Sequence, residues 1–563
     1  MNLLAKSCFC PGIIALLGNL VKSAGDQDME EIQHDYFKEY LTGMGHEIYR
    51  VKLSPAFSGK KFVEIAQTVY KDYQGIIFCL EIQFESDALV VLNPGNFEIP
   101  SKFKNNVYVY IICEDKKVAD QVTTYNLNVE EPDNNANPYE KGGAGQGETQ
   151  KIELDRRPDW IEEIDHDAIQ KHIDTENINI FELEYAVLDE PHNIMNITKV
   201  SIQNSTKIRD HIVVCGIHSA LYSFILPLRA RYLKELMYIV ILNPEPPGPE
   251  LWNQISVFPN LIYVRGSPLV NEDLIRAGIK HAKKAVIMDS GKNNSTDIPR
   301  VDNSNDRMTD AESIFIYKAI KKCNPGLQIM IELVYPSNIE FLEPKSVQKE
   351  DMLKAKEGNE FNYEFLSLYA SGEVYISAII DTLTCQSYYN PHIVTILKQL
   401  LSSGQSNTNA LKMMGICEEA DIKQSNFWQI PVPEDYHSKT FGDLFNYLCI
   451  QRALIPIGLY RMPGATDNER PYVYTNPPNT VKLTPQDKIF VLGNAMPDDL
   501  KEVNPPKGAQ GHSEELSAGM GGAEIEEHEQ INHNLHEDER DDNDEVDKGV
   551  DLNERIESSS HVL

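Results

Sequence analysis

The sequence predicts an α/β protein built around a doubly wound parallel sheet. Between Asp210 and Leu333, five apolar runs alternate with segments of helical periodicity. Runs that are apolar on both faces and separated by helices are typical of parallel strands covered on both sides. We expect strands at 211–215, 238–242, 261–264, 285–288 and 327–333, with an amphipathic helix at 219–236 after the first strand.

The turn after the first strand argues against a dinucleotide site on this sheet. A dinucleotide fingerprint has three glycines there, which let the backbone approach the pyrophosphate, and an acidic residue after the second strand, which binds the ribose. Here the turn holds a single glycine, Gly216, followed by bulky side chains, and Asn243 stands after the second strand. The sequence therefore predicts a Rossmann-like sheet and no NAD.

A smaller α+β unit occurs twice, once on each side of the sheet region. Each copy has a helix followed by three apolar strands and an Asn-Pro turn. The expected strands are 75–82, 88–92 and 107–112 in the first copy and 453–460, 472–475 and 489–492 in the second. Phe62 and Phe441 are 379 positions apart, and Asn93 and Asn476 are 383 apart. Because the spacing changes only by loop insertions, we interpret the two units as an internal repeat.

The repeat gives a domain organisation. A linking helix is expected before each copy, at 11–21 and 374–400. Only the second copy has the parallel-sheet unit before it, so the sequence is expected to begin within a unit whose first half is missing. The expected parts are the first copy (1–125), a polar linker (126–205), the Rossmann-like lobe (206–335), a variable segment (336–373), the linking helices with the second copy (374–495) and an acidic, disordered tail (496–563).

Composition excludes several classes of protein. The formal net charge of the 563 residues is −33, which argues against a nucleic-acid partner. From Lys501 to the C-terminus there are eighteen acidic and five basic residues, a composition typical of solvated disordered chain. The nine cysteines are scattered without a CxxC pair, as in reduced cytosolic proteins. The sequence contains no apolar run of the roughly 18–20 residues that span a bilayer.

Several local motifs together resemble one known family. They are Lys6-Ser-Cys8, Leu92-Asn-Pro-Gly95, Pro227-Leu-Arg-Ala230, Gly266-Ser-Pro-Leu269, Ile331-Glu-Leu-Val334, Asn338-Ile-Glu-Phe-Leu342 and Tyr474-Thr-Asn-Pro-Pro478. With the repeat, they resemble the paired cytoplasmic RCK domains of large-conductance calcium-activated potassium channels, the BK or Slo family. The resemblance covers about residues 1–125 and 195–495.

The resemblance implies a function. In that family each subunit carries a membrane pore followed by two RCK domains, and four subunits form a gating ring that couples ion binding to pore opening. This chain would then be the gating-ring portion of a potassium channel subunit. It would lie at the cytoplasmic face of a membrane, assemble with its own channel subunits as a homotetramer, and lack the pore domain.

The resemblance also implies calcium candidates in two places. Glu81 matches a glutamate that binds calcium in the family's first RCK domain; the alternative is a buried carboxylate satisfied by a backbone amide or a lysine. In the second domain, the family's dense Asp run is replaced by a segment with interleaved lysines, which leaves Glu340, Glu343, Glu350 and Asp351 as candidates. A calcium ion takes six to eight oxygens, so we expect weak calcium binding or a solvated loop here.

Catalytic motifs are absent from the sequence. Gly-x-Ser-x-Gly, Walker and His-Glu-x-x-His patterns do not occur, and we expect no enzyme. Two alternatives to the channel hypothesis stay open at this point. One is a Rossmann-type nucleotide-binding enzyme, which the turn at Gly216 argues against. The other is a free-standing soluble RCK ligand sensor, which the incomplete first unit argues against.

Overall fold

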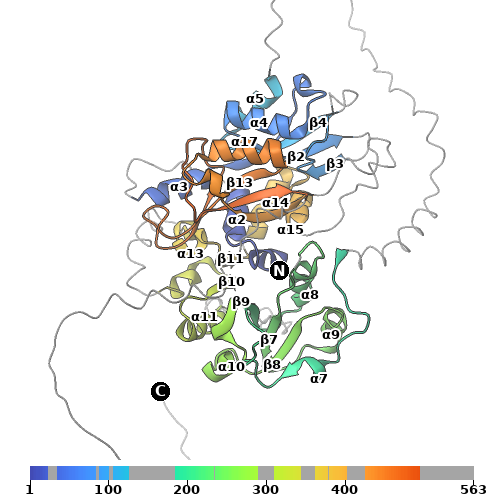
Figure 1. Cartoon of the computed structure of the whole chain (residues 1–563), viewed down its shortest axis with the longest axis vertical. Coiled ribbons are helices and arrows are strands. Elements are labelled where there is room, and N and C mark those ends of the chain that lie inside the picture. Colours follow the sequence, from blue (N-terminus) through green and yellow to red (C-terminus); the bar gives the residue numbers. More distant parts are fainter. Residues whose placement is uncertain are drawn as a thin grey trace, which may run out of the picture. The chain divides into compact units, whose positions relative to one another are not determined.

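The computed structural model describes residues 1–22, 34–83, 88–99, 106–125, 184–233, 235–288, 310–343, 362–377, 379–401 and 425–494. Within these residues the chain forms one seven-stranded sheet and two four-stranded sheets (Figure 1). The expected acidic tail at 496–563 and most of the expected linker at 126–205 lie outside the described residues.

The seven-stranded sheet is parallel throughout, which confirms the predicted Rossmann-like lobe. Its strand order is β11-β10-β9-β6-β7-β8-β5, and every neighbouring pair is parallel. All five predicted strands are present, and two short strands extend the two edges. The strands are β5 (Thr198–Lys199), β6 (His211–Cys215), β7 (Ile239–Asn243), β8 (Leu261–Arg265), β9 (Ala282–Ile287), β10 (Gln328–Leu333) and β11 (Val374–Ile376).

Both faces of this sheet are buried. Alternate residues of β6 enter separate clusters, with Val213 in one and Val214 in the other. The Val214 face also buries Leu4, Ala5 and Cys8, which belong to the first helix of the chain and the turn after it. The N-terminal segment therefore completes the core of a lobe that follows it by about two hundred residues. The helices of this region are α1 (Asn2–Ser7), α7 (Ile194–Ile197), α8 (Leu221–Ile225), α9 (Pro249–Ile255), α10 (Asn271–Arg276), α11 (Ala311–Cys323) and α13 (Ser367–Ala370).

The helix predicted at 219–236 is much shorter than expected, so that prediction was wrong in its extent. The α-helical part, α8, ends at Ile225 and continues as a single 3₁₀ turn, η4 (Leu226–Arg229). Pro227 has no N–H and cannot extend an α-helical ladder. Ala230 is already extended, with φ −63° and ψ 133°.

The linking helix predicted at 374–400 also begins later than expected. Val374–Ile376 is the edge strand β11, paired in parallel with Ile331–Leu333 of β10. The helices that follow are α14 (Ile379–Tyr389) and α15 (Ile393–Leu401). A three-residue apolar run reads equally well as a strand or as a turn of helix, and pairing with β10 decides the outcome.

The internal repeat is confirmed by two sheets of identical topology. Their orders are β1-β4-β2-β3 and β12-β15-β13-β14, all antiparallel. Each sheet has a register shift at the same repeat position, between Ile77 and Cys79 and between Pro456 and Gly458. The strands are β1 (Glu47–Lys52), β2 (Ile76–Gln83), β3 (Ala88–Leu92), β4 (Val107–Cys113), β12 (Asn426–Pro431), β13 (Ile455–Arg461), β14 (Tyr472–Thr475) and β15 (Lys488–Gly493).

Helices of each copy pack on elements of the other copy. Helix α3 (Asp35–Met44) of the first copy packs on β14 of the second, and α15 of the second copy packs on β3 of the first. Helix α4 (Phe62–Tyr73) packs on α17 (Phe441–Arg452). At that contact the rings of Tyr70 and Phe445 stack with centroids 4.0 Å apart. The remaining helices of the copies are α2 (Ile13–Val21), buried at every residue, and α5 (Lys116–Thr124).

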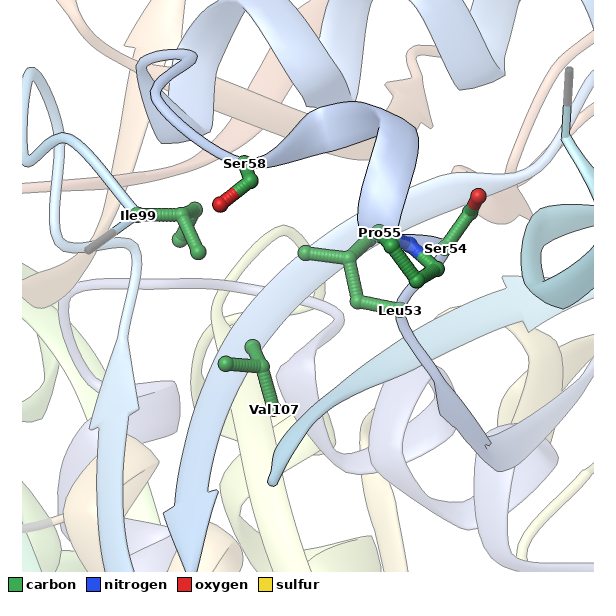
Figure 2. Close-up of a pocket in the computed structure, with 6 residues that line it drawn as sticks. All are labelled: Leu53, Ser54, Pro55, Ser58, Ile99 and Val107. Atoms are coloured by element: carbon green, nitrogen blue, oxygen red, sulfur yellow. The ribbon is translucent and has the colours of Figure 1, made fainter. Parts of the chain in front are cut away.

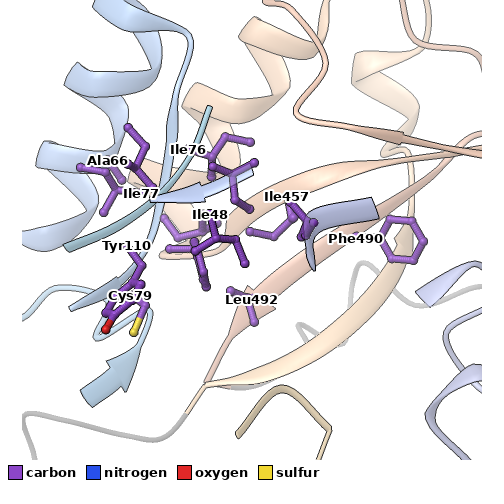
Figure 3. Close-up of a cluster of buried hydrophobic side chains, with 14 of the residues drawn as sticks. Ile48, Ala66, Ile76, Ile77, Cys79, Tyr110, Ile457, Phe490 and Leu492 are labelled. Atoms are coloured by element: carbon purple, nitrogen blue, oxygen red, sulfur yellow. The ribbon is translucent and has the colours of Figure 1, made fainter. Parts of the chain in front are cut away.

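The two Asn-Pro turns make matching hydrogen bonds across this contact. Asn93 donates its amide hydrogens to the carbonyls of Ala453 (2.9 Å) and Leu492 (2.8 Å). Asn476 donates in the same way to Gln74 (2.9 Å) and Ile112 (3.5 Å). Figure 3 shows side chains of both sheets meeting in one buried cluster. The two copies therefore share a single hydrophobic core.

Glycines mark a close backbone approach near the start of α2. Gly372 has φ +73°, and a Cβ there would lie 2.6 Å from the Cα of Gly12. Gly464 has a similar φ of +80°, but a Cβ at that position would have no heavy atom within 4 Å of it. A side chain at either glycine would strain the backbone, because φ is positive at both. Only at Gly372 would the new Cβ also clash with a neighbouring backbone.

We predict that Gly372→Ala destabilises the chain by about 1–3 kcal/mol more than Gly464→Ala, because only the first substitution forces two backbones apart. Gly464→Ala should cost about 1 kcal/mol through its positive φ alone. Urea denaturation of both variants beside the wild type measures the difference. Equal midpoints for the two variants would contradict the close approach.

Candidate functional site

Glu81 lies in β2 and is fully buried. Arg50 of β1 reaches it from the side with two hydrogen bonds, Nε to Oε2 at 2.8 Å and Nη2 to Oε1 at 2.7 Å. The Tyr110 hydroxyl of β4 donates to Oε2 at 2.9 Å. The Arg50 guanidinium also stacks 3.7 Å above the ring of Tyr108. Both oxygens of Glu81 are thus occupied by donors of the chain itself.

The electrostatics of Glu81 follow from these contacts. Burial alone would raise the pKa of the Glu81 carboxyl, but the hydrogen bonds and charge of Arg50, with the Tyr110 hydroxyl, outweigh it and leave the pKa below its ordinary value. Arg50 in turn has a raised pKa, chiefly because of its hydrogen bonds to Glu81. The carboxylate is held ionised without a metal ion.

The segment between α14 and α15, which belongs to the second copy, also contacts Glu81 and β1. His392, which directly precedes α15, has Nε2 3.8 Å from Oε1 of Glu81. Two residues earlier, Asn390 donates to the carbonyl of Ile48 in β1 at 3.0 Å. The charge at Glu81 is therefore in contact with both copies.

Glu343 occupies a different place, two residues after the end of η8 (Pro336–Phe341). Its side chain is buried, and Oε1 lies 3.3 Å from Nη2 of Arg470 and 3.4 Å from Oγ of Ser367. Arg470 also approaches the buried Glu373, with Nη1 3.9 Å from Oε2. Glu350 and Asp351 lie outside the described residues. The structure therefore gives Glu81 and Glu343 separate sets of partners.

Sequence reasoning missed the partners of both glutamates. Arg50 and Tyr110 face each other across the β1–β4 pair, and β1 was not predicted as a strand. Arg470 comes from the loop before β14, more than a hundred positions from Glu343. Within the described ranges, no three His, Cys, Asp or Glu side chains lie close enough together to hold a metal ion.

The glycine turn after β6 packs closely against the rest of the chain. Gly216 has φ +92°, and a Cβ there would lie 2.8 Å from the carbonyl oxygen of Met288. The ring Nδ1 of His218 accepts a hydrogen bond from the Ala220 amide at 2.9 Å. An amide at the start of α8 is thus bonded within the chain, whereas a phosphate cradle presents such amides to its ligand.

One pocket in the described part of the chain lies in the first copy, and its lining includes neither Glu81 nor Glu343 (Figure 2). It contains no ionisable side chain, and it offers apolar walls with two hydroxyls. Its lining residues are Leu53, Ser54, Pro55, Ser58, Ile99 and Val107.

Three family models match the chain in order. Residues 1–80 match the calcium-activated BK potassium channel alpha subunit, and residues 207–331 match the calcium-activated potassium channel slowpoke-like RCK domain. Residues 393–493 match the Ca²⁺-activated K⁺ channel Slowpoke, TrkA_C-like domain. The fold and these matches define a chain of RCK domains. The matched segments belong to the slowpoke-type potassium channel family, as the sequence resemblance indicated. The matched models describe parts of channels, and none of them describes an enzyme.

Curated relatives agree with this placement, and a solved structure has a similar fold. Potassium channel subfamily T member 1 of Homo sapiens is 22% identical over 93% of this chain and 47% of its own length. The Gallus gallus protein of the same name is 23% identical over 89% of this chain and 46% of its own length. The human SLO3 gating ring is similar in fold, with a TM-score of 0.61 and 20% identity, over 87% of this chain and 74% of that one. The chain spans about half the length of these curated relatives.

In the part of the chain that the structure describes, no helix has both the length and the apolar character needed to cross a bilayer.

We predict that Arg50→Gln destabilises the chain by about 3–5 kcal/mol near neutral pH, because it leaves the buried Glu81 carboxylate without its cation. The double variant Arg50→Gln/Glu81→Gln should recover more than half of that loss. Lys38→Gln, which removes a partner from the exposed Asp35 pair at 3.8 Å, serves as a control and should change little. Urea denaturation measures all three.

We also predict how the destabilisation caused by Arg50→Gln changes with pH. In the folded wild type the pKa of Glu81 is below its value in the unfolded chain. The ionised carboxylate therefore stabilises the fold at a pH above the unfolded pKa, and this stabilisation is lost as the pH falls through the folded pKa. Without Arg50, burial raises that pKa, and protonation relieves the buried charge. The difference in unfolding free energy between the wild type and Arg50→Gln should therefore shrink as the pH falls from about 7 to about 5. A deficit that stays constant over this range would contradict the account.

Proposed function

We propose that this chain is the cytosolic gating-ring portion of a potassium channel subunit, which couples ion binding to pore opening. The observation that carries the proposal is the combination of a Rossmann-like lobe with two four-stranded lobes that share one core. Family models of slowpoke-type channels match these parts in the same order along the chain. In this function the chain lies at the cytoplasmic face of a membrane and acts on a pore domain outside these 563 residues.

The partners follow from the same proposal. Gating rings are closed assemblies, and we propose a homotetramer of channel subunits, each with its own pore segment. The human SLO3 gating ring, which has a similar fold, supports the ring assignment. The net charge of −33 supports the absence of a nucleic-acid partner.

Calcium is the proposed ligand class, with weak affinity. Of the candidates, Glu81 is neutralised by Arg50, and Glu343 lies beside Arg470. An ion at either carboxylate competes with an arginine already in place, which lowers its apparent affinity. We therefore expect calorimetry on the purified chain to show weak calcium binding or none.

The nucleotide-binding enzyme is the weaker alternative. The closed turn at Gly216 and the His218 hydrogen bond to Ala220 leave less backbone open to a phosphate than a dinucleotide site requires. We propose that the sheet serves as a rigid body that transmits force, with no NAD and no catalytic step.

A chimera tests the proposed function. Residues 1–563 replace the aligned part of the human potassium channel subfamily T member 1, and currents are recorded from excised patches while the ions on the cytoplasmic face are varied. We expect potassium currents whose open probability changes with a cytoplasmic cation. The control is the same relative truncated before the aligned part. A chimera that reaches the surface and behaves like the truncated control would refute the function.

A further inference from the structure

Two lysines are buried where α1 meets the parallel sheet. Lys6 of α1 is 1% exposed, and Lys284 of β9 is 4% exposed. Lysine is almost never fully buried unless it is paired with an acid. Here Lys284 donates from Nζ to the Ser7 carbonyl at 2.8 Å, and Lys6 donates from Nζ to the Tyr232 hydroxyl at 3.1 Å. Both acceptors are neutral, so within the described chain neither ammonium group is hydrogen-bonded to a carboxylate.

The surroundings of Lys6 supply no negative charge. Its Nζ lies 5.0 Å from the centroid of the Phe9 ring and 5.4 Å from that of the Tyr232 ring. The helical elements that pack on α1 are α2, α8, η4 and α15, and none of them contains an Asp or a Glu. Their titratable side chains are Tyr222, Arg229 and Lys398. These helices therefore offer Lys6 no counter-charge.

Positive charge also predominates around Lys284. Lys283 of the same strand and Lys488 of β15 both act on its ammonium group. The neighbouring thiols of Cys8 and Cys10 are neutral near pH 7, because burial raises the pKa of Cys8 to about 12 and that of Cys10 to about 11. The thiols therefore do not balance the lysine charges.

Two carboxylates of the lobe act on other cations. Glu373 precedes β11, and the charge of Lys321 acts on it more strongly than that of Lys284 does. Glu332 of β10 acts on the amino group of Met1. Each of these carboxylates therefore serves a cation other than the two buried lysines.

Burial is the dominant influence on both lysines. It disfavours the charged form and lowers the pKa of Lys6, and likewise that of Lys284, to about 8. A neutral amine can keep the same contacts, because it still donates to the Ser7 carbonyl and can accept a hydrogen bond from the Tyr232 hydroxyl. Loss of the two protons therefore removes buried charge without removing a hydrogen bond.

The helix that carries Lys6 joins two parts of the chain. Leu4, Ala5 and Cys8 complete one face of the parallel sheet. Five residues after the end of α1, α2 begins at Ile13 and enters the core that the two copies share. A change in how firmly α1 docks on the sheet is therefore a change in the contact between the parallel sheet and the repeated lobes.

We propose that Lys6 and Lys284 make the docking of α1 on the parallel sheet sensitive to protons. The helix docks more firmly when both ammonium groups have released their protons to solvent, and less firmly when both are charged. The two lysines thus form a proton-sensitive contact between the Rossmann-like lobe and the repeated lobes. This contact depends on neither a pore nor a bound ion, so its failure in a test on the purified chain would leave the proposed function standing.

The direction of the effect follows from the linkage between docking and protonation. The pKa of about 8 in the docked state lies below the ordinary lysine value of 10.5, so the undocked helix binds more protons between these two values. Docking therefore strengthens as the pH rises from about 8 to about 10.5, and below about 8 the cost of burying the charges is fully present. Each lysine should raise the docking equilibrium constant about tenfold between about pH 7 and about pH 9.

Hydrogen exchange measures the docking of α1 in the purified chain. The amides of Cys8 and Cys10 are hydrogen-bonded to carbonyls of α1. Their protection, corrected for the intrinsic pH dependence of exchange, should rise at least about tenfold more in the wild type than in Lys6→Met/Lys284→Met between about pH 7 and about pH 9. Methionine is an unbranched, flexible side chain without a charge, and the Met1 amino group titrates in both proteins.

The matched control is Lys318→Met, which removes an exposed lysine of α11. Protection of α1 in this variant should follow the wild type at every pH. The proposal is overturned if the wild type and Lys6→Met/Lys284→Met change in parallel over this range of pH.

A second measurement reads the protonation itself and does not require a stable double variant. Lysines labelled with ¹³C at Cε are titrated by NMR in the wild-type chain. The resonance that disappears in Lys6→Met, and the one that disappears in Lys284→Met, should each titrate with a midpoint near pH 8. If no lysine resonance of the wild type titrates below about pH 9.5, both ammonium groups keep their protons and the proposal is overturned.

Discussion

The pairing of the two repeated lobes is the constraint on which the rest of the described chain depends. Helices α4 and α17 pack together, and the two Asn-Pro turns each donate to carbonyls of the opposite copy. Because each copy contributes buried residues and hydrogen bonds to the other, neither lobe has a complete core alone. Helices α3 and α15 belong to the same body, since α3 packs on β14 and α15 packs on β3. The Rossmann-like lobe is joined to it through α1, whose apolar residues finish one face of the parallel sheet.

The buried ion pairs of this body differ in how closely their partners approach. Glu81 is held by Arg50 with two short bonds, and Arg461 is fixed between Glu39 and Asp487. Arg470 contacts its two glutamates more loosely and is the more exposed cation. Removing one partner from a buried pair leaves an uncompensated charge and is strongly destabilising.

The sequence predicted those elements that have long apolar patterns. It did not predict elements whose secondary structure depends on a contact with a distant part of the chain. Five parallel strands and the repeat follow from apolar runs of four to seven residues and from the paired asparagine turns. The strand at Val374–Ile376 could not be predicted, because only its pairing with β10 distinguishes it from helix. Pro227 was visible, yet the amphipathic pattern around it suggested a longer helix. Glu81 and Glu343 were identified through resemblance, but their arginines lie on other strands and loops, and no local pattern links them.

The central claim is that the two copies form one cooperative unit. Native-state hydrogen exchange of β2 (Ile76–Gln83) and β13 (Ile455–Arg461), measured in the wild type and in Asn476→Ala, tests it most directly. Asn476→Ala removes the hydrogen bonds to Gln74 and Ile112 of the first copy. The account predicts that the opening free energies of both strands fall by the same amount. A fall confined to β13, with β2 unchanged, would show that the copies are separate folding units and would contradict it.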